Sequence, residues 1–270
     1  TIAKAVLTVT AVDSAKFVGM SDPSGYGGVI YSGFKNSDSA TSGALGSAVI
    51  SVSRSNVSEN NAGSYAAVLA PNVSTDLTNY TVAYVPGKFT IVGANQLLVQ
   101  VGSNTTVYGT VPSYSAGSMT VSYCTDCAPG ISSPNIVSIS GAGITVSGSS
   151  LTIVTGNTTA TLALAPVNAV LNSAGTQLTV GTYSLAASGT SISSSSGPAN
   201  FNAVTVIGGL GVTPLVLNYA DLGISGVTQV YNGSVNMSNI SLSAASGILS
   251  GDSVAISATG TFASRNVGIN

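Results

Sequence analysis

The segment Leu7-Thr8-Val9-Thr10-Ala11 alternates apolar and hydroxyl-bearing side chains, and Tyr80-Thr81-Val82-Ala83-Tyr84 repeats this alternation further along the chain. A period of two places alternate side chains on opposite faces of a β-strand. Similar short runs recur between turn clusters such as Asp22-Pro23-Ser24-Gly25 and Ser195-Ser196-Gly197-Pro198. No segment has the apolar stripe of an amphipathic helix. The sequence therefore predicts an all-β protein of the sandwich or barrel type.

The composition excludes several classes of partner. Only 5% of the 270 residues are charged, against about 25% in an ordinary soluble domain. The six basic residues are scattered singly, so no basic patch is present to bind nucleic acid. No apolar run approaches the roughly 20 residues of a spanning helix. The abundance of Ser, Thr, Asn and Gly favours a secreted β-protein, with no nucleic acid and no membrane span in this segment.

Internal similarity defines the expected domains. Ala62-Gly63-Ser64-Tyr65 has a counterpart in Val180-Gly181-Thr182-Tyr183, and the segments Asn79–Gly87 and Asn200–Gly208 have the same length. Each unit opens with a strand and ends with a strand that enters the next unit. We therefore expect a module at 1–93, a second module at 94–212 with an insertion around 115–175, and a partial module at 213–270.

The two Gly-x-Tyr segments indicate the type of module. In immunoglobulin-like sandwiches, a Tyr at a strand corner hydrogen-bonds back to the backbone while its ring fills the end of the core. Tyr65 and Tyr183 are candidates for this role, although ordinary strand tyrosines remain the alternative. The expected fold is a row of immunoglobulin-like β-sandwiches arranged end to end, in a rod of about 100 Å. A row of β-grasp-like modules is the alternative.

The repeats resemble the MBG modules of large bacterial surface adhesins, including proteins exported by two-partner secretion. The resemblance rests on Leu7–Ala11, Tyr31-Ser32-Gly33-Phe34, Ala62–Tyr65 and Asn79–Ile91. The tail resembles the start of a YDG module, through Val230-Tyr231-Asn232-Gly233, Ser250-Gly251-Asp252-Ser253, Gly260-Thr261-Phe262-Ala263 and Asn266-Val267-Gly268. Asn232 departs from the eponymous tripeptide. The resemblance implies a stalk or adhesive repeat and carries over no catalytic residue.

The side-chain chemistry argues against an enzyme. The chain has no His, which removes Ser-His-Asp and Cys-His arrangements and the commonest zinc ligand. Its eight acidic residues lie far apart and form no calcium-binding loop. We therefore expect no catalytic residue, no cofactor and no metal. Two carboxylates that meet in space, as in a glycosidase, remain the alternative.

Cys124-Thr125-Asp126-Cys127 is the one reactive group that the sequence offers. A thioredoxin-like role needs a βαβ setting, and a zinc knuckle needs two further ligands. Neither is present, so we expect a local disulfide between Cys124 and Cys127, formed in an oxidising compartment. Two free thiols are the alternative.

Tyrosines near turns are candidates for stacking on sugar rings. Tyr114 and Tyr123 are the candidate ligand-contacting side chains, and core packing is the alternative for each. Asn-x-Ser/Thr sequons are frequent, as chance predicts for this composition, and their glycosylation stays open; they start at Asn56, Asn72, Asn79, Asn104, Asn157, Asn232, Asn236 and Asn239.

Together these features predict an extracellular segment of an adhesin on a bacterial cell surface, acting as a stalk or spacer in adhesion or biofilm formation. The alternative is a carbohydrate-binding module that uses the 115–175 insertion. Expected partners are host or matrix glycans, other cell-surface molecules and flanking repeats. The first residues have no signal-peptide pattern, so we expect the segment to be an interior piece of a longer chain.

Overall fold

The computed structural model describes residues 2–217, 223–224, 229–237, 242–243, 247–255 and 259–267. Within these ranges the protein is built from β-strands in several small sheets, with two short 3-10 turns, η1 (Ala116–Ser118) and η2 (Gly141–Gly143). The all-β prediction is therefore confirmed. The chain divides into two compact units: residues 1–169 with 180–213, and residues 170–179 with 214–270.

The first module, residues 1–93, contains two sheets. One has the strand order β3-β1-β6 and the other has the order β2-β7-β5-β4. The strands are β1 (Ala5–Ala11), β2 (Ser14–Phe17), β3 (Val29–Ser32), β4 (Ile50–Arg54), β5 (Gly63–Val73), β6 (Tyr80–Val85) and β7 (Gly87–Val92).

A parallel ribbon runs through both sheets of this module. The segment β1–β2 pairs with β6–β7, from Ala5 opposite Tyr80 to Phe17 opposite Val92, and the pairing keeps one offset along its whole length. The ribbon changes sheets at a kink after β1. There Asp13 Oδ1 accepts a hydrogen bond from the Lys88 N–H at 2.7 Å. A side chain thus replaces the ladder contact that the kink interrupts.

The second module, residues 94–169 with 180–213, repeats this strand order. Its sheets are ordered β11-β10-β8-β16 and β12-β13-β14-β15-β17-β9. The strands are β8 (Gln96–Val101), β9 (Asn104–Val107), β10 (Met119–Cys124), β11 (Ile136–Ile139), β12 (Ile144–Ser147), β13 (Ser150–Thr155), β14 (Thr158–Pro166), β15 (Gly181–Ser194), β16 (Ala203–Ile207) and β17 (Gly209–Thr213).

The second parallel ribbon pairs β8–β9 with β16–β17, from Gln96 opposite Ala203 to Val107 opposite Thr213. The difference in number between paired residues changes by one at the kink. The core order β3-β1-β6 corresponds to β10-β8-β16, and β2-β7-β5-β4 corresponds to β9-β17-β15-β14. The added strands β11, β12 and β13 lie within the 115–175 insertion and extend both sheets at their edges.

Two equivalent glycines explain the equal spacing found in the sequence. A Cβ on Gly87 would lie 2.7 Å from the Ala11 carbonyl oxygen, and one on Gly208 would lie 2.8 Å from that of Val101. Real Cβ atoms do not approach backbone oxygen so closely. Each glycine therefore lets the last strand cross over the first where the ribbon changes sheets.

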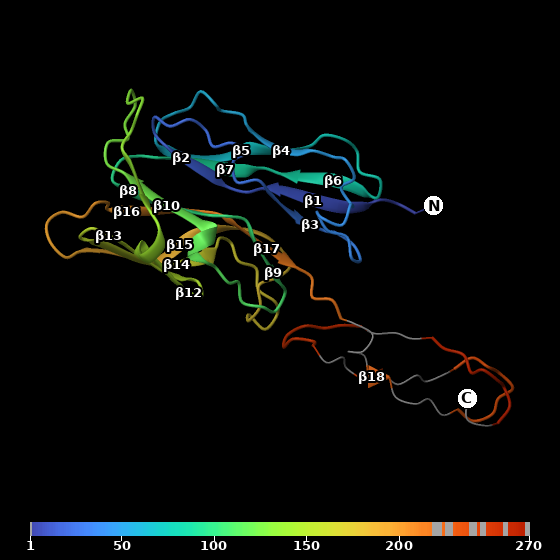
Figure 1. The fold of residues 1–270 in the computed structure, drawn as a ribbon. Coiled ribbons are helices and arrows are strands. Elements are labelled where there is room, and N and C mark those ends of the chain that lie inside the picture. The colour runs from blue at the N-terminus through green and yellow to red at the C-terminus, as the bar shows by residue number, and fades with distance from the viewer. Residues whose placement is uncertain are drawn as a thin grey trace. The chain divides into compact units, whose positions relative to one another are not determined.

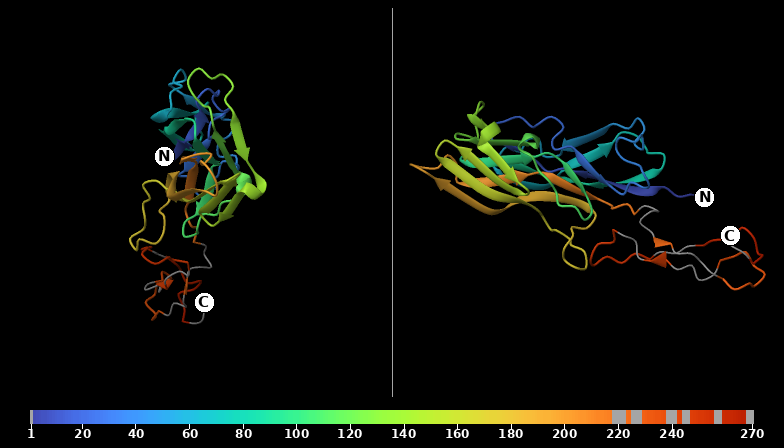
Figure 2. Two further views of the ribbon diagram at one scale, coloured as in Figure 1. Left: turned by 90° about the vertical axis from the view of Figure 1, so that its left-hand side faces the viewer. Right: turned by 60° about the horizontal axis from the view of Figure 1, so that its bottom comes forward.

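The two modules lie side by side and share a core, which corrects the end-to-end arrangement expected for them. One buried cluster combines residues of both modules: Ala11, Ala15, Phe17, Val18, Leu69, Phe89, Ile91, Val92, Leu98, Cys124, Cys127 and Ile207. Figure 1 shows β2 and β8 together at one end of the first unit, with β1, β9 and β17 toward the other. The strands of both modules follow one long direction (Figure 2). Burial of apolar surface favours this doubled arrangement.

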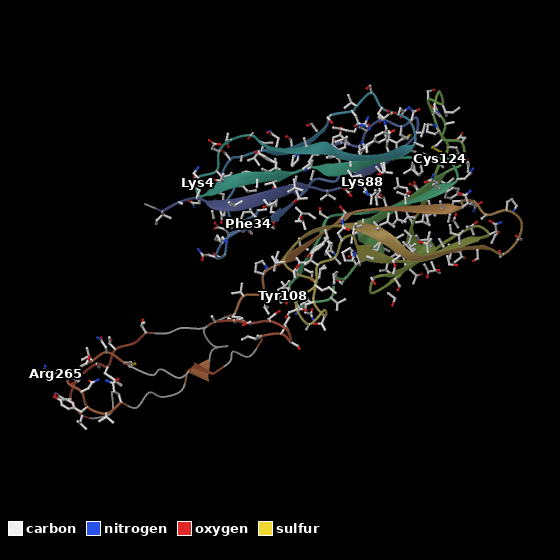
Figure 3. All side chains as sticks on the ribbon, turned by 180° about the vertical axis from the view of Figure 1, so that it is seen from behind. Lys4, Phe34, Lys88, Tyr108, Cys124 and Arg265 are labelled. Carbon is white, nitrogen blue, oxygen red and sulfur yellow. A yellow bond between two sulfur atoms is a disulfide. The ribbon has the colours of Figure 1, made fainter. Side chains whose placement is uncertain are left out.

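A second core lies at the end of the first module away from the disulfide. It is formed by Leu7, Val9, Val73, Leu77 and Tyr80. Figure 3 shows Lys4 and Phe34 at this end and Cys124 at the opposite end.

The second unit has little regular structure in its described residues. It contains the short antiparallel pair β18 (Gly223–Ile224) and β19 (Leu242–Ser243), with single bridges joining Leu171 to Leu178 and Asn236 to Thr261. Asn172 Nδ2 donates to the Ser250 carbonyl at 3.0 Å, so the 170–179 loop is bound to the tail. Gly268, part of the predicted YDG pattern, lies outside the described residues.

Candidate binding surface

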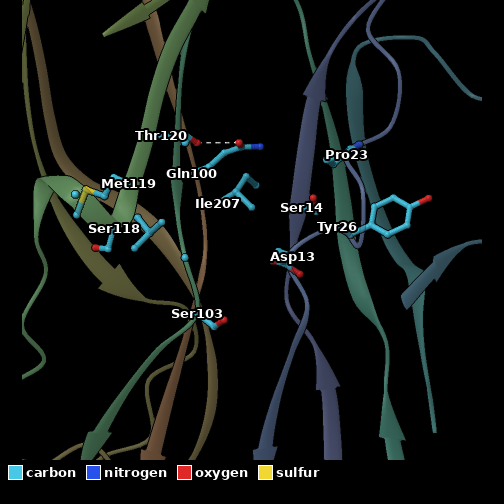
Figure 4. Close-up of a pocket in the computed structure, with 14 residues that line it drawn as sticks. Asp13, Ser14, Pro23, Tyr26, Gln100, Ser103, Ser118, Met119, Thr120 and Ile207 are labelled. Carbon is cyan, nitrogen blue, oxygen red and sulfur yellow. Dashed lines mark hydrogen bonds between the residues drawn. The ribbon is translucent and has the colours of Figure 1, made fainter. Parts of the chain in front are cut away.

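A hollow of the first unit lies between the two modules. It encloses about 390 Å³ and is bounded by strands of both modules, as Figure 4 shows. Its lining is mostly hydroxyl, amide and glycine: Asp13, Ser14, Pro23, Tyr26, Gly27, Gln100, Val101, Gly102, Ser103, Gly117, Ser118, Met119, Thr120 and Ile207.

Gln100 and Asp13, which line this hollow, already have partners within the protein. Gln100 Nε2 donates across the modules to the Ala15 carbonyl at 3.0 Å, and Gln100 Oε1 accepts from the Thr120 hydroxyl at 3.1 Å. Asp13 is buried, and its second carboxylate oxygen lies 3.6 Å from Lys88 Nζ. The hollow is thus a polar seam between modules, in which Gln100 and Asp13 serve the fold.

Tyr114, a predicted ligand-contacting residue, lines a smaller neighbouring hollow of about 210 Å³. Gly102, Ser103 and Ser118 border both hollows, so the two are adjacent. Burial raises the pKa of the Tyr114 hydroxyl above its ordinary value of 10.0. A half-buried aromatic ring beside hydroxyl and amide groups has the composition of a site for a neutral polar ligand.

Tyr123, the other predicted ligand-contacting residue, belongs to the core, and that prediction is corrected. It is 7% exposed, and its ring centre lies 5.6 Å from that of Phe201. In the first module the equivalent place holds the edge-to-face pair of Phe34 and Tyr80. The alternation along β10 (Met119–Cys124) points Tyr123 inward, and the ring is used for packing.

A cluster of charges in the first module was missed by the sequence analysis. Asp22 lies 3.0 Å from Lys16 Nζ and 3.2 Å from Arg54 Nε, and it accepts a hydrogen bond from the Tyr26 hydroxyl at 3.0 Å. The Arg54 side chain is fully buried, and its guanidinium carbon lies 4.4 Å from the centre of the Phe89 ring. Arg54 and Phe89 lie far from Asp22 in the sequence, so no spacing rule reveals the whole cluster.

This cluster holds loops rather than a substrate. Arg54 Nη2 donates to the carbonyls of Val57 and Glu59 at 2.8 and 3.0 Å. Burial, followed by the hydrogen bond to Asp22, raises the pKa of Tyr26. A buried Arg that is paired, hydrogen-bonded and stacked on an aromatic ring fixes local conformation.

The predicted disulfide is present between Cys124 and Cys127, whose Cα atoms are 5.8 Å apart. Asp126 lies close to the two sulfurs, but oxidation leaves no thiolate for a metal ion. Asp126 Oδ1 instead accepts a hydrogen bond from the Asn135 N–H at 2.6 Å. The cysteines and Asp126 therefore brace one loop of the second module.

Tyr65 has the contacts expected of a corner tyrosine. Its hydroxyl donates to the Asn61 carbonyl at 2.9 Å, four residues upstream, and its ring packs against the shared core. Tyr183 lies at the equivalent place in β15, and its ring lies over Gly181, as that of Tyr65 lies over Gly63. At Gly63 the missing side chain leaves room for the Tyr65 ring, whereas a Cβ on Gly181 would make an ordinary contact with Tyr183, 3.7 Å from its hydroxyl oxygen.

The sequons occupy different environments. Asn157 Nδ2 donates to the Ser196 and Pro198 carbonyls, and Asn104 Nδ2 donates to the Ser113 carbonyl at 2.7 Å. These amides are engaged in loop contacts. Asn72 and Asn79 are exposed, and Asn239 lies outside the described residues.

Comparison with known families places two named domains on the chain. Residues 7–90 match the MBG domain of the YGX type, and residues 213–270 match the YDG domain. The chain carries an MBG domain followed by a YDG domain. The segment between the two matches repeats the strand order of the MBG domain. No match was found among curated proteins or among solved structures.

Among the described residues, no helix has the length and apolar character needed to cross a membrane.

Proposed function

We propose that this protein is an extracellular structural and adhesive repeat segment of a bacterial surface adhesin, acting as a stalk or spacer in cell adhesion or biofilm formation. The observation that carries the proposal is the repeated parallel ribbon, in which the chain crosses each module from one end to the other. A module that is entered at one end and left at the other can be strung in series and can bear tension. The MBG and YDG matches are consistent with such a segment.

The proposal includes immunoglobulin-like modules, supported by the two sheets of each module and by the corner contact of Tyr65. It includes a location outside the cell, in keeping with the Cys124–Cys127 disulfide. It also includes the absence of catalysis, since the sequence has no His. The acidic residues Asp13 and Asp22 are engaged in structural ion pairs.

The test is to display the chain on a non-adherent bacterium through a C-terminal anchor. Attachment to host-cell monolayers and biofilm mass would be compared with cells that display an unrelated β-sandwich of similar length. We expect attachment or biofilm mass to rise several-fold. Equal values for the two strains would overturn the adhesive role.

The second candidate is a carbohydrate-binding module, favoured by the position of Tyr114 at the smaller hollow. Ser115 and Ser118, at the start of the 115–175 insertion, line the same hollow. Host or matrix glycans would be the ligands. A glycan array probed with the protein and with the Tyr114→Ala variant tests this role. Binding that is lost in the variant supports it, while no binding to any glycan leaves only the structural role.

A further inference from the structure

The path of the chain through the first unit is a hairpin of modules. Gln100 contacts Ala15 by a hydrogen bond of 3.0 Å. Farther along, the Thr182 and Thr10 hydroxyl oxygens are 3.1 Å apart. Thr182 pairs with Gly211 in β17, near the exit of the second module. The second module therefore runs back along the first, and the entry at β1 and the exit at β17 lie at the same end of the unit.

A single tight bend joins the two modules. Asn95 has a φ of 59°, in the left-handed region. Its N–H donates to the Cys124 carbonyl at 2.7 Å, and its carbonyl accepts from the Asn202 N–H at 2.9 Å. The joint is thus one short, well-bonded turn, from which the two modules can separate without breaking any strand pairing within either module.

The contact between the modules includes apolar packing beside the hydrogen bonds of Gln100 and Thr182. A Cβ on Gly211 would lie 2.8 Å from Ile30 Cγ2, and one on Gly209 would lie 2.7 Å from Ile30 Cδ1. The Ile30 side chain is thus seated on two glycines of β17. The ion pairs found among the described residues, Lys16–Asp22, Arg54–Asp22 and Lys88–Asp13, all lie within the first module.

Tension between entry and exit acts differently on the contact between the modules and on the strand pairing inside each module. The contact between modules is pulled apart from its open end, one group of residues after another, beginning near Thr10 and Thr182. Within each module the first and last strands are parallel and hydrogen-bonded. Once the modules are in line, tension shears all of these hydrogen bonds together. Contacts that break in sequence yield at a lower force than contacts that must break at once.

We propose that the two modules form a hinged pair that opens at Asn95 under tension and lengthens the tether before either module unfolds. This inference deepens the proposed function and rests on the segment being a load-bearing tether. At roughly 3.3 Å per residue each ribbon is about 40 Å long. Opening therefore places entry and exit about 80 Å apart. Release of tension allows the apolar faces to meet again, so the extension is reversible.

The test is single-molecule force spectroscopy on the full chain. One handle is attached at the amino terminus and the other at a click-reactive side chain that replaces Pro214. We expect a reversible lengthening of roughly 60 Å at low force, followed at higher force by much longer unfolding steps. A record without any step before unfolding would overturn the hinge.

A covalent lock identifies the origin of the step. In the double variant Thr10→Cys and Thr182→Cys, an oxidised bond would hold the open end of the pair closed. We expect the early step to disappear in the oxidised variant and to return on reduction. Unchanged protein with and without reductant controls for the native disulfide. A step that persists in the locked protein would show that it does not come from separation of the modules.

A matched pair of glycine variants tests the contact between the modules. In Gly211→Ala the added methyl meets Ile30, whereas in Gly117→Ala it meets nothing within 4 Å. We expect the first variant to open about tenfold faster or more at a given force, and the second to behave as the unchanged protein. Equal opening rates contradict the proposal. If the early step is seen but the displayed chain does not raise adhesion, the hinge is retained and the adhesive role is rejected. If adhesion rises but no early step is seen, only the hinge is rejected.

Discussion

Residues 1–93 contain ten of the fourteen charged side chains of the protein, whereas residues 94–213 contain one, Asp126. The two modules nevertheless share a strand order, including the parallel ribbon that changes sheets at a kink. In the first module the kink is bonded by Asp13, and the loops are held by Lys16, Asp22 and Arg54. In the second module a disulfide and three added strands brace the sheets.

The difference teaches that charge is dispensable for this strand order. What the modules have in common is backbone geometry: a glycine at the crossing, a glycine beneath the corner tyrosine, and a turn at Gly19 and Gly109, both with a φ of 85°. Steric constraints at such points act on every sequence, while ion pairs can be exchanged for other contacts of similar strength. The charges of the first module and the disulfide of the second module thus both hold loops against the sheets.

The largest expected effect tests the shared geometry. Gly87→Val and Gly208→Val each place side-chain atoms against a backbone carbonyl, which cannot move without breaking the ribbon. We expect each variant to lower the free energy of unfolding by about 3 kcal/mol or more. Urea denaturation followed by circular dichroism measures this, with Gly117→Ala as the control. A large loss at only one glycine would end the claim that the kinks are equivalent.

The second-largest expected effect is a difference in stability between variants of the first and the second module. Asp13→Ala leaves the partly buried Lys88 N–H without its acceptor, and we expect a loss of about 2 kcal/mol in the free energy of unfolding. The equivalent position in the second module is Ser103, which is exposed, so Ser103→Ala should change the free energy by less than about 0.5 kcal/mol. The same urea experiment compares both variants. Similar losses would mean that the second kink depends on its side chain as the first does.

Loss of the disulfide should act on the second module and the bend. Closing so short a loop contributes about 2 kcal/mol in the chain-entropy picture. For Cys124→Ser with Cys127→Ser, we expect faster hydrogen exchange at Asn95 and around β10 and β11, with no change in β1 and β3. A thiol assay on the unfolded, unreduced protein should find no free thiol. Two free thiols per chain would contradict the pairing.

The smallest effect concerns alkaline pH. The hydrogen bond to Asp38 raises the pKa of Tyr80, and burial raises those of Tyr26, Tyr31 and Tyr65, all in the first module. In the second module a raised pKa is found for Tyr114. A raised folded-state pKa favours the neutral form, so this stability is complete below pH 10 and is lost as the pH rises through the folded pKa.

Thermal unfolding between pH 8 and pH 11 measures this loss. We expect the unfolding temperature to fall by a few degrees above pH 10. Tyr80→Phe should flatten the fall, because the titrating hydroxyl is removed, and Tyr114→Phe should flatten it less. An identical pH dependence in both variants would argue that the alkaline loss is not concentrated in the first module.

Local patterns were enough to predict many elements. Alternation identified β1 and β6, since a half-buried strand needs one apolar face. The equal spacing from Asn79 to Gly87 and from Asn200 to Gly208 revealed the repeat, because both glycines meet the same steric demand. The spacing of Cys124 and Cys127 allowed a local bond. Each of these features depends on residues that are close in sequence or that recur at a fixed interval.

Two features could not be predicted in this way. The contact of the Tyr123 ring with Phe201 joins two residues that lie far apart in the sequence. The cluster of Lys16, Asp22 and Arg54 depends on loops that fold over the sheet. The periodicity of the sequence does not predict these contacts, because the packing of loops brings the residues together and strand geometry does not.

By itself, the sequence determined the strands, the repeat, the short disulfide and the resemblance to MBG and YDG domains. Only the tertiary structure decided that the first two modules fold back on each other. The joint around Asn95 is short enough for a straight connection, and its left-handed φ of 59° turns the chain instead. Apolar surface buried between the modules favours the doubled pair over the straight one. This buried surface is contributed by residues far apart in the sequence, so no single segment predicts it.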